Sequence, residues 1–504
     1  MAISGSTSFN ESSPAEVLAV QKSSPIAIST LVILVTVAAG CVARSFADEE
    51  MLNLPGVASV LLVTLFATQF AITGRLAFLL VLAIPAYFGS SPWNSPVRAH
   101  FGPETFPVYV FDLLVLSGGG IAVLEAVLSR ATPTALFMRQ QGAIVAVISV
   151  IAILKLIEVG ISAESVRNAA VFYYFVATCL GLAYVHRHVD LKYAIPSLFL
   201  RSIPIAAIVP AVCLVGISLG GRELVLDSIG RQGLVTPAGI LALAPPGSLV
   251  LLSFLGAGFL VEDRVPLWSR AAIVVLLIYD FVTYWDRALW LAISFGIAVG
   301  WMVKKGWRSV LLVACVLAAL MTTADTIRSS VAEGHNKSSE WRLLAWGVTV
   351  IGIADRPFWG HPYDKSVFGQ VLQTSDSQTA IAASNIRLNE QARSPHNSYL
   401  TLLFFGGIVQ GGAVIAFILG TLIGLGRELA WRIRVRSPSW LGEAVFRGGC
   451  ACALYAGFNV VLESPVEAIT FWILFFPAWL WLMSLRQERR TICSLPSARA
   501  HVQV

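Results

Sequence analysis

The chain has 504 residues, of which 56% are hydrophobic and 13% are charged, and its formal net charge is +6. Soluble domains carry roughly 25% charged residues, so the composition excludes an ordinary soluble domain and indicates a protein surrounded mainly by lipid. The apolar runs are long and continuous rather than alternating, which predicts membrane-spanning helices. The basic residues concentrate in short stretches between these runs, so the positive charge does not imply nucleic acid binding.

We expect an all-α polytopic membrane protein with about fourteen transmembrane helices, within a range of about 12–14, and one large extracytoplasmic loop that contains short helices. The predicted segments in chain order are Pro25–Ala43, Pro55–Ile72, Leu76–Phe88, Val108–Leu128, Ala143–Ile161, Ala169–Val185, Ile203–Leu219, Ile240–Val261, Leu267–Tyr284, Ala288–Val303, Ser309–Ala324, Ser398–Leu425, Ala444–Leu462 and Ile469–Met483. The sequence Pro245-Pro246-Gly247 interrupts the eighth segment, and we interpret this break as a packing feature.

Four regions follow from this pattern. Residues 1–24 form a polar cytoplasmic tail, and residues 25–266 contain the N-terminal transmembrane helices. Residues 267–485 form a second membrane region that includes a polar loop at 325–396, and residues 486–504 form a second cytoplasmic tail.

Lysine and arginine residues predict the orientation. They cluster in three short stretches, at residues 304–308, 427–447 and 486–490. Such stretches lie in the cytoplasm by the positive-inside rule. The loop 325–396 is therefore expected outside the cytoplasm, and both chain termini are expected inside it.

The polar loop is the most informative part of the chain. Loops longer than about 12–15 residues are usually functional or disordered, and the aromatic residues throughout this loop favour an ordered structure. A Ser-Ser-Glu sequence that ends at Glu340 precedes the apolar run Trp341–Ile353, which predicts a capped amphipathic helix that ends before Pro357. A further helix is expected to start at His396, directly after a proline.

Three residues are expected to meet at the outer face. Arg287 starts the tenth predicted helix, Arg342 lies on the loop helix, and His396 ends the loop. A charge near the membrane is costly unless it is paired or used. Two guanidinium groups on one face would bind phosphate through paired hydrogen bonds, and a histidine beside them could take the proton of an attacking hydroxyl.

Each of these residues also has a simpler interpretation. An arginine at a membrane surface is commonly an anchor that reaches the water, and Arg287 could pair with Asp286. Arg342 could pair with Glu340 or Asp355, and the histidine could be an ordinary surface residue. The residues alone therefore predict a polar outer site that suits an anion.

Three motifs occur in a fixed order in this region. They are Arg342-x3-Trp346, then Pro357-Phe358-Trp359-Gly360-His361, then His396-Asn397-Ser398-Tyr399-Leu400 followed by Gly406-Gly407. Together with Arg287 at a helix start before the loop, this order resembles the superfamily of O-antigen ligases and O-antigen or exopolysaccharide polymerases. The resemblance covers roughly residues 267–478.

The resemblance implies glycosyl transfer at the outer face of a bacterial inner membrane, from an undecaprenyl-diphosphate-linked oligosaccharide to a hydroxyl of an acceptor glycan. It implies that Arg287 and Arg342 bind the diphosphate and stabilise its departing charge, and that His396 is the catalytic base. Supporting residues are expected at His361, Asn397 and Glu340, with His361 interpreted first as a residue that stabilises a turn. Direct attack would invert the anomeric carbon, and neither a metal nor a cofactor is expected.

The leading hypothesis is a polysaccharide polymerase for exopolysaccharide or O-antigen, because the chain is long and has many predicted helices. Its partners would be the lipid-linked donor, the acceptor glycan and membrane lipids, with a chain-length regulator and a flippase as further partners. An O-antigen ligase, which transfers the glycan to lipid A-core, is the closest alternative.

Two other classes stay open. A metal-dependent lipid-phosphate glycosyltransferase could use Asp48-Glu49-Glu50 as ligands, although charged residues of a solvated loop are the favoured interpretation of these acids. A lipid-linked oligosaccharide flippase or another transporter could use Lys155 and Glu158, which share one face of the fifth predicted helix or form a structural ion pair. The chain lacks an evident internal repeat, which argues against a transporter.

Overall fold

The computed structural model describes most of the chain from residue 133 onward. The described residues are 100–101, 108–109, 115–116, 119–120, 122–123, 127–128, 133–160, 162–186, 189–219, 224–226, 232–236, 239–242, 249–283, 286–305, 336–364, 395, 397–435, 437–459, 461–462 and 465–494. The predicted segments before residue 100, the predicted segment Ser309–Ala324, the acids Asp48-Glu49-Glu50, residues 365–394 of the loop and His396 lie outside the described residues.

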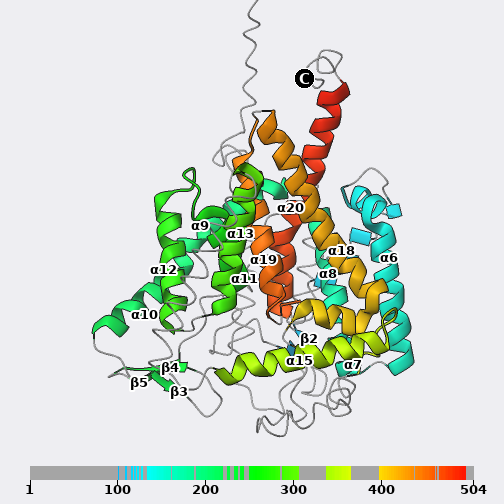
Figure 1. Ribbon diagram of the computed structural model, residues 1–504, viewed down its shortest axis with the longest axis horizontal. Coiled ribbons are helices and arrows are strands. Elements are labelled where there is room, and N and C mark those ends of the chain that lie inside the picture. Colours follow the sequence, from blue (N-terminus) through cyan, green and yellow to red (C-terminus); the bar gives the residue numbers. More distant parts are fainter. Residues whose placement is uncertain are drawn as a thin grey trace, which may run out of the picture.

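Helices make up nearly all of the described chain (Figure 1). They are α6 Pro133–Val159, α7 Ala163–Asn168, α8 Ala170–His186, α9 Leu191–Ala206, α10 Ile208–Leu219, α11 Leu249–Phe259, α12 Leu267–Thr283, α13 Arg287–Lys305, α15 Asn336–Asp355, α18 Ser398–Arg434, α19 Trp440–Ala456 and α20 Pro465–Ser494. Two small antiparallel sheets accompany them: β1 His100–Phe101 with β2 Val108–Tyr109, and β3 Leu224–Leu226, β4 Gln232–Thr236 and β5 Gly239–Ala242 in that order.

Five of the described helical stretches are long and apolar enough to cross a membrane. They are Arg139–Val159, Leu191–Val212, Arg287–Lys305, Ser398–Arg434 and Glu467–Ile492. Ala170–His186, Leu249–Phe259 and Ala345–Asp355 are shorter apolar helices. The predicted helical membrane architecture is therefore confirmed for the described residues, and the total of about fourteen spans stays a prediction.

The eighth predicted segment differs from the structure. The sequence predicts one helix over Ile240–Val261, but residues 239–242 form strand β5 and α11 starts only at Leu249. Pro245-Pro246-Gly247 stands between the two elements. A proline lacks the backbone donor and disfavours helical geometry in the residue before it, so this sequence separates two elements instead of bending one helix.

The seventh predicted segment starts earlier than expected. The sequence predicts a helix from Ile203, whereas α9 begins at Leu191 and α10 follows it after Ala207. The side chain of Asp190 caps α9 by accepting a hydrogen bond from the Lys192 backbone N–H at 3.3 Å. A cap of this kind fixes the start of a helix at a position that an apolar run alone does not mark.

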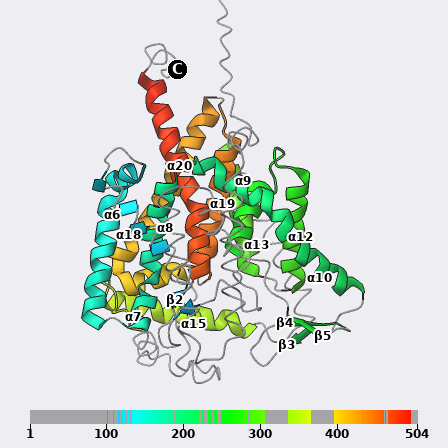
Figure 2. The same cartoon turned by 180° about the vertical axis from the view of Figure 1, so that it is seen from behind.

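The core is built around α19 and α20. α11 and α13 pack closely on α19, because a Cβ on Gly258 would lie 2.7 Å from the Ala444 carbonyl oxygen and one on Gly296 would lie 2.5 Å from that of Arg447. Small residues of this kind let membrane helices approach each other. Figure 2 shows α6 and α8 on one flank of this centre and α10 and α12 on the other.

One end of the bundle gathers the basic residues. Lys304 at the end of α13 forms an ion pair with Glu443 at the start of α19. At the same end, Arg432 of α18 pairs with Glu488 of α20 at 2.9 Å, and Arg489 pairs with Glu428 at 3.4 Å. The structure thus brings the three basic stretches of the sequence to one end, which we call the basic end.

Candidate active site at the α15 end

The end opposite the basic end is crossed by α15. Figure 1 shows this helix running across the lower end of the bundle, next to the start of α18 and the lower end of α19. The helix spans Asn336–Asp355, somewhat longer than the predicted run Trp341–Ile353, and it ends before Pro357 as the sequence predicts. Arg342 and Glu340 therefore both lie near its beginning.

Three elements meet at residues 455–462, which end α19 and lead to α20; we call this stretch the junction. The Tyr455 hydroxyl donates a hydrogen bond at 2.9 Å to Oδ2 of Asp286, the residue directly before α13. Arg342 Nη1 on α15 donates to the Phe458 carbonyl at 3.4 Å. Ser398 Oγ, at the start of α18, donates to the Asn459 carbonyl at 3.0 Å. The beginnings of α13, α15 and α18 are thus held at one place.

Ser398 is fully buried and satisfies the junction backbone. Its hydroxyl oxygen accepts hydrogen bonds from the backbone N–H groups of Val461 at 2.9 Å and Leu462 at 3.0 Å. Buried backbone donors need such partners. The residue is part of the third sequence motif, and its contacts explain why a small hydroxyl side chain suits this position.

Arg287 is the first residue of α13. The preceding Asp286 caps this helix, since its Oδ1 accepts from the backbone N–H groups of Ala288 at 2.9 Å and Leu289 at 3.2 Å. The carboxylate of Asp286 is thus used by the helix start and by Tyr455. The partly buried Arg287 emerges where the helix N-terminus carries partial positive charge, which favours an anion.

Arg342 is partly buried and lies one helical turn before Trp346. The Trp346 Nε1–H donates to the Pro395 carbonyl at 2.8 Å, and its ring lies 5.9 Å from that of Phe458. The proposed pairing of Arg342 with Asp355 is excluded, because thirteen residues of α-helix separate the two by about 20 Å. Glu340 lies outside the residues whose side chains the structure describes.

Both neighbours of His396 are described, although His396 itself is not. Pro395 is buried and its carbonyl is bound by Trp346. Asn397 caps α18, with Oδ1 accepting from the backbone N–H groups of Tyr399 at 3.0 Å and Leu400 at 3.1 Å. The described helix starts at Ser398, where the predicted apolar segment Ser398–Leu425 begins and two residues after the start predicted from Pro395.

His361 lies apart from the junction, in the segment between α15 and residue 364. Its ring is buried, stacks on Phe404 with centroids 4.3 Å apart, and its Nε2–H donates to the Gly352 carbonyl at 2.9 Å. Burial lowers the pKa of His361, so the neutral ring with its proton on Nε2 is favoured.

A joint connects this segment to α18. The joint consists of residues 357–363, which we call the wedge, and the bend of α18 at Gly407, where φ is +59° and ψ is −168°. Across it, the Ile408 N–H donates to the Pro357 carbonyl at 2.7 Å, and the His361 N–H donates to the Phe404 carbonyl at 2.7 Å. The bend leaves some backbone groups of α18 without hydrogen-bond partners in the helix, and the wedge supplies partners to these groups.

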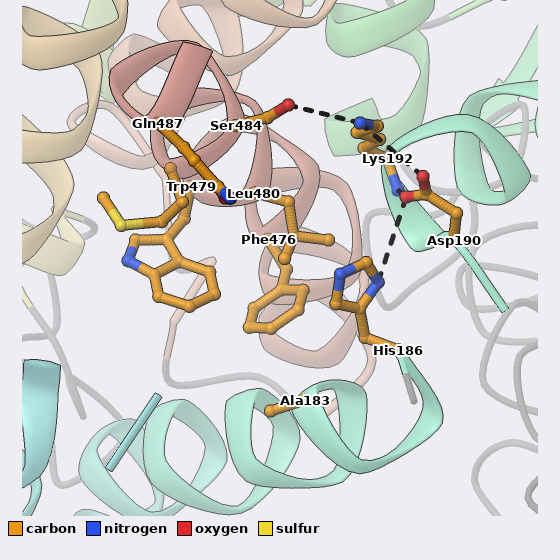
Figure 3. A pocket seen from close by; sticks show the side chains of 10 residues that line it. Ala183, His186, Asp190, Lys192, Phe476, Trp479, Leu480, Ser484 and Gln487 are labelled. Carbon is orange, nitrogen blue, oxygen red and sulfur yellow. Dashed lines mark hydrogen bonds and ion pairs between the residues drawn. The ribbon is translucent and has the colours of Figure 1, made fainter. Parts of the chain in front are cut away.

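A cavity of about 220 Å³ lies at the basic end, and Arg287, Arg342, His361 and Asn397 are not among its lining residues (Figure 3). The polar residues that line the cavity contact one another. Lys192 Nζ lies 3.3 Å from Ser484 Oγ and 3.6 Å from the Asp190 carboxylate, and His186 lies 3.9 Å from the same carboxylate. The charges in this cavity are engaged with one another and lie far along the bundle from the motif residues. Arg342 donates to the junction, and Arg287 directly follows Asp286, which accepts from the junction residue Tyr455. We therefore place the candidate active site at the α15 end.

A comparison with known protein families gives a match in the second half of the chain. Residues 267–417, less than a third of the chain, match the family described as O-Antigen ligase. Comparison with curated proteins gives no match. The apolar helices and this family match define a membrane protein of a glycosyl-transferring class. Over residues 267–417 the chain is similar to the O-antigen ligases, which confirms the superfamily expected from the motifs.

The family match covers α12, α13, α15 and the first half of α18. It therefore includes Arg287, Arg342, His361, His396 and Asn397, and it ends before the junction. Tyr455 and the Phe458 and Asn459 carbonyls were missed by sequence reasoning, because a tyrosine in an apolar helix and two backbone carbonyls give no signal in the sequence.

Proposed function

We propose that this protein is a polysaccharide polymerase that transfers glycan from an undecaprenyl-diphosphate carrier to the hydroxyl of an acceptor glycan. The observation that carries the proposal is the junction, where α13, α15 and α18 begin side by side within and next to the family-matched region. Each of these helices carries one of the motif residues at or near its start. The reaction needs cationic groups that stabilise the departing diphosphate of the donor and a base that takes the acceptor proton; in this proposal Arg287 and Arg342 supply the cations and His396, next to the start of α18, supplies the base.

In the proposed reaction, the acceptor oxygen attacks the anomeric carbon, and the bond from that carbon to the diphosphate oxygen breaks. The electron pair of the broken bond goes to the diphosphate, and Arg287 and Arg342 stabilise the charge that develops there. His396 takes the hydroxyl proton, a contribution of roughly 10²- to 10⁴-fold. One displacement inverts the anomeric carbon, and no metal ion is needed.

The supporting residues receive different roles in this proposal. Asn397, the residue after the base, caps α18, and its own position is thereby fixed by the helix start. The buried ring of His361 uses its Nε2 proton on Gly352, which favours a role in stabilising the turn over a role as base. Glu340, near the start of α15, is retained as a candidate for orienting Arg342.

We further propose that the α15 end faces away from the cytoplasm in a bacterial inner membrane, with both chain termini in the cytoplasm. The gathering of Lys304, Arg432 and Arg489 at the basic end supports this orientation through the positive-inside rule. A chain-length regulator and a flippase would then be expected as partners in the same membrane.

A flippase is the less favoured class. Lys155, the residue that suggested one, is buried and donates to main-chain carbonyls of the wedge and α18, while Glu158 is exposed. A lysine engaged in this way has a structural use, whereas a transport residue would line a path.

The O-antigen ligase reading is the alternative favoured by the description of the matched family. The purified protein should extend a lipid-linked repeat unit into longer lipid-linked chains when no other acceptor is supplied. Transfer to lipid A-core without chain extension would instead assign the ligase activity. If the purified protein forms neither product from a competent donor, that result would contradict glycosyl transfer itself.

The variants Arg287→Lys and Arg342→Lys test the site. Lysine keeps the charge but loses the planar pair of donors that matches a diphosphate, so we expect each variant to lower kcat by about 10²-fold. The readout is polymer formed per minute by purified protein. Arg270→Lys is the matched control, because Arg270 pairs with Asp263 at 3.7 Å near the basic end and should keep wild-type activity. Full activity of either site variant would reduce that arginine to a membrane anchor.

Chelation separates this mechanism from a metal-dependent one. Because guanidinium groups neutralise the leaving diphosphate, activity should persist in excess EDTA, and replacing Asp48, Glu49 and Glu50 together by neutral residues should have a mild effect. Loss of turnover in EDTA that Mg²⁺ or Mn²⁺ restores, together with an inactive triple variant, would move the catalytic centre to those acids.

A further inference from the structure

Lys155 of α6 is a buried charge that the proposed reaction does not use. Its ammonium group donates to the carbonyls of Trp359 and Phe405, and to that of His361 at 3.2 Å. The side chain is 7% exposed, and the partners stand 204 to 250 residues away in the sequence. Three donors on one ammonium thus meet three acceptors on two segments.

The acceptors lie on both sides of the joint. Trp359 and His361 belong to the wedge, and Phe405 lies two residues before the bend of α18 at Gly407. A bend removes helical partners from nearby carbonyls, and a buried carbonyl without a partner is costly. The carbonyls of Pro357 and Phe404 accept hydrogen bonds from N–H groups of the joint. Lys155 completes this arrangement by donating hydrogen bonds to carbonyls of the joint.

A second contact ties α6 to the same place. Gln410 of α18 is buried, donates through Nε2 to the Ile148 carbonyl of α6 at 2.9 Å, and accepts the Tyr363 hydroxyl at 2.8 Å. Lys155 Nζ also lies 5.3 Å from the centre of the Tyr363 ring. α6, the wedge and α18 are thus connected by two independent sets of polar contacts in a buried environment.

The joint determines how α15 meets α18. One residue, Arg356, separates the end of α15 from the wedge, and the bend lies about nine residues after the start of α18. A change in the bend would therefore move the start of α18, with Asn397, relative to Arg342 on α15. A shift of about 1 Å between catalytic groups can cost roughly 10²-fold in rate.

We infer that Lys155 is a positioning residue that sets the bend of α18 and thereby the place of the α18 start relative to Arg342. The structural part of this inference stands on the contacts alone, and its catalytic part rests on the proposed function. The ammonium of Lys155, on a helix outside the family-matched region, replaces the helical donor that the Phe405 carbonyl loses at the bend and joins that carbonyl to two carbonyls of the wedge.

The test measures shape and rate separately. Spin labels on Ile351 of α15 and Leu419 of α18, which are 61% and 49% exposed, report the distance across the joint by electron spin resonance. The labelled background lacks the seven native cysteines. We expect one narrow distance distribution in the wild type, a broad or shifted one in Lys155→Met, and an intermediate one in Lys155→Gln, whose amide keeps a donor.

In the same proteins without labels, kcat should fall by about 10²-fold in Lys155→Met while KM for the lipid-linked donor changes little. Lys155→Arg keeps several donors and should recover part of both the distance distribution and kcat. Lys192→Met is the matched control, because Lys192 is a partly buried lysine that contacts Ser484 at the basic end.

An unchanged distance distribution in Lys155→Met, or in Lys155→Gln if the methionine variant does not accumulate, would overturn the inference. A changed distribution with wild-type kcat would overturn its catalytic part. If the wild-type protein transferred no glycosyl group, the proposed function would fail, while the distance measurements would still decide whether Lys155 sets the bend.

Discussion

Replacing His396 by alanine is expected to abolish polymer formation, with a loss of roughly 10²- to 10⁴-fold in kcat. The neighbours of this residue support the expectation: the carbonyl of Pro395 is bound by Trp346, one helical turn from Arg342, and Asn397 caps α18. The measurement is polymer formed by purified protein, with membrane insertion and protein level compared to wild type.

The control for this variant is His186→Ala. His186 lies beside Asp190 in the cavity of the basic end and should not affect the reaction. Wild-type polymer levels in His396→Ala would remove the base from the mechanism and would leave the two arginines as a binding site only. Loss of activity in both histidine variants would indicate a general effect on the fold.

Replacing Gly407 by alanine should cause the largest loss of stability. Its backbone, at φ +59° and ψ −168°, is in a region that is essentially restricted to glycine. An added Cβ would also lie 2.2 Å from the Phe358 carbonyl oxygen. Backbone strain alone costs about 1–3 kcal/mol, and the contact with the wedge adds to it, so the joint should open or the protein should fail to accumulate.

Gly420→Ala is the matched control for this prediction. Gly420 is in the same helix, and a Cβ there would have no atom within 4 Å. Alanine is a better helix former than glycine by about 1 kcal/mol, so this variant should be neutral or stabilised. The readout is the Tm in detergent, and equal Tm values for the two variants would contradict the assigned strain.

The sequence by itself determined the class of the protein. Long apolar runs and few charges predicted membrane helices, because backbone groups in lipid must be satisfied within a helix. The order of short motifs predicted the superfamily that the family match confirmed. Local signals also placed particular boundaries: Pro395 before α18 and Pro357 after α15 restrict the backbone next to them, so their effects can be read from neighbouring residues.

Only the tertiary structure decided what lies between distant segments. Residues 398–425 read as one apolar helix, yet α18 bends at Gly407, because the wedge inserts its carbonyls and N–H groups there. Lys155 could be interpreted from the sequence as a transport residue or an ion pair, and its carbonyl partners show a different use. The physical reason is that hydropathy and caps report the surroundings of a residue along its own helix. The partners of Arg342, His361 and Lys155 instead come from backbone groups elsewhere in the chain, and main-chain carbonyls look alike in every sequence.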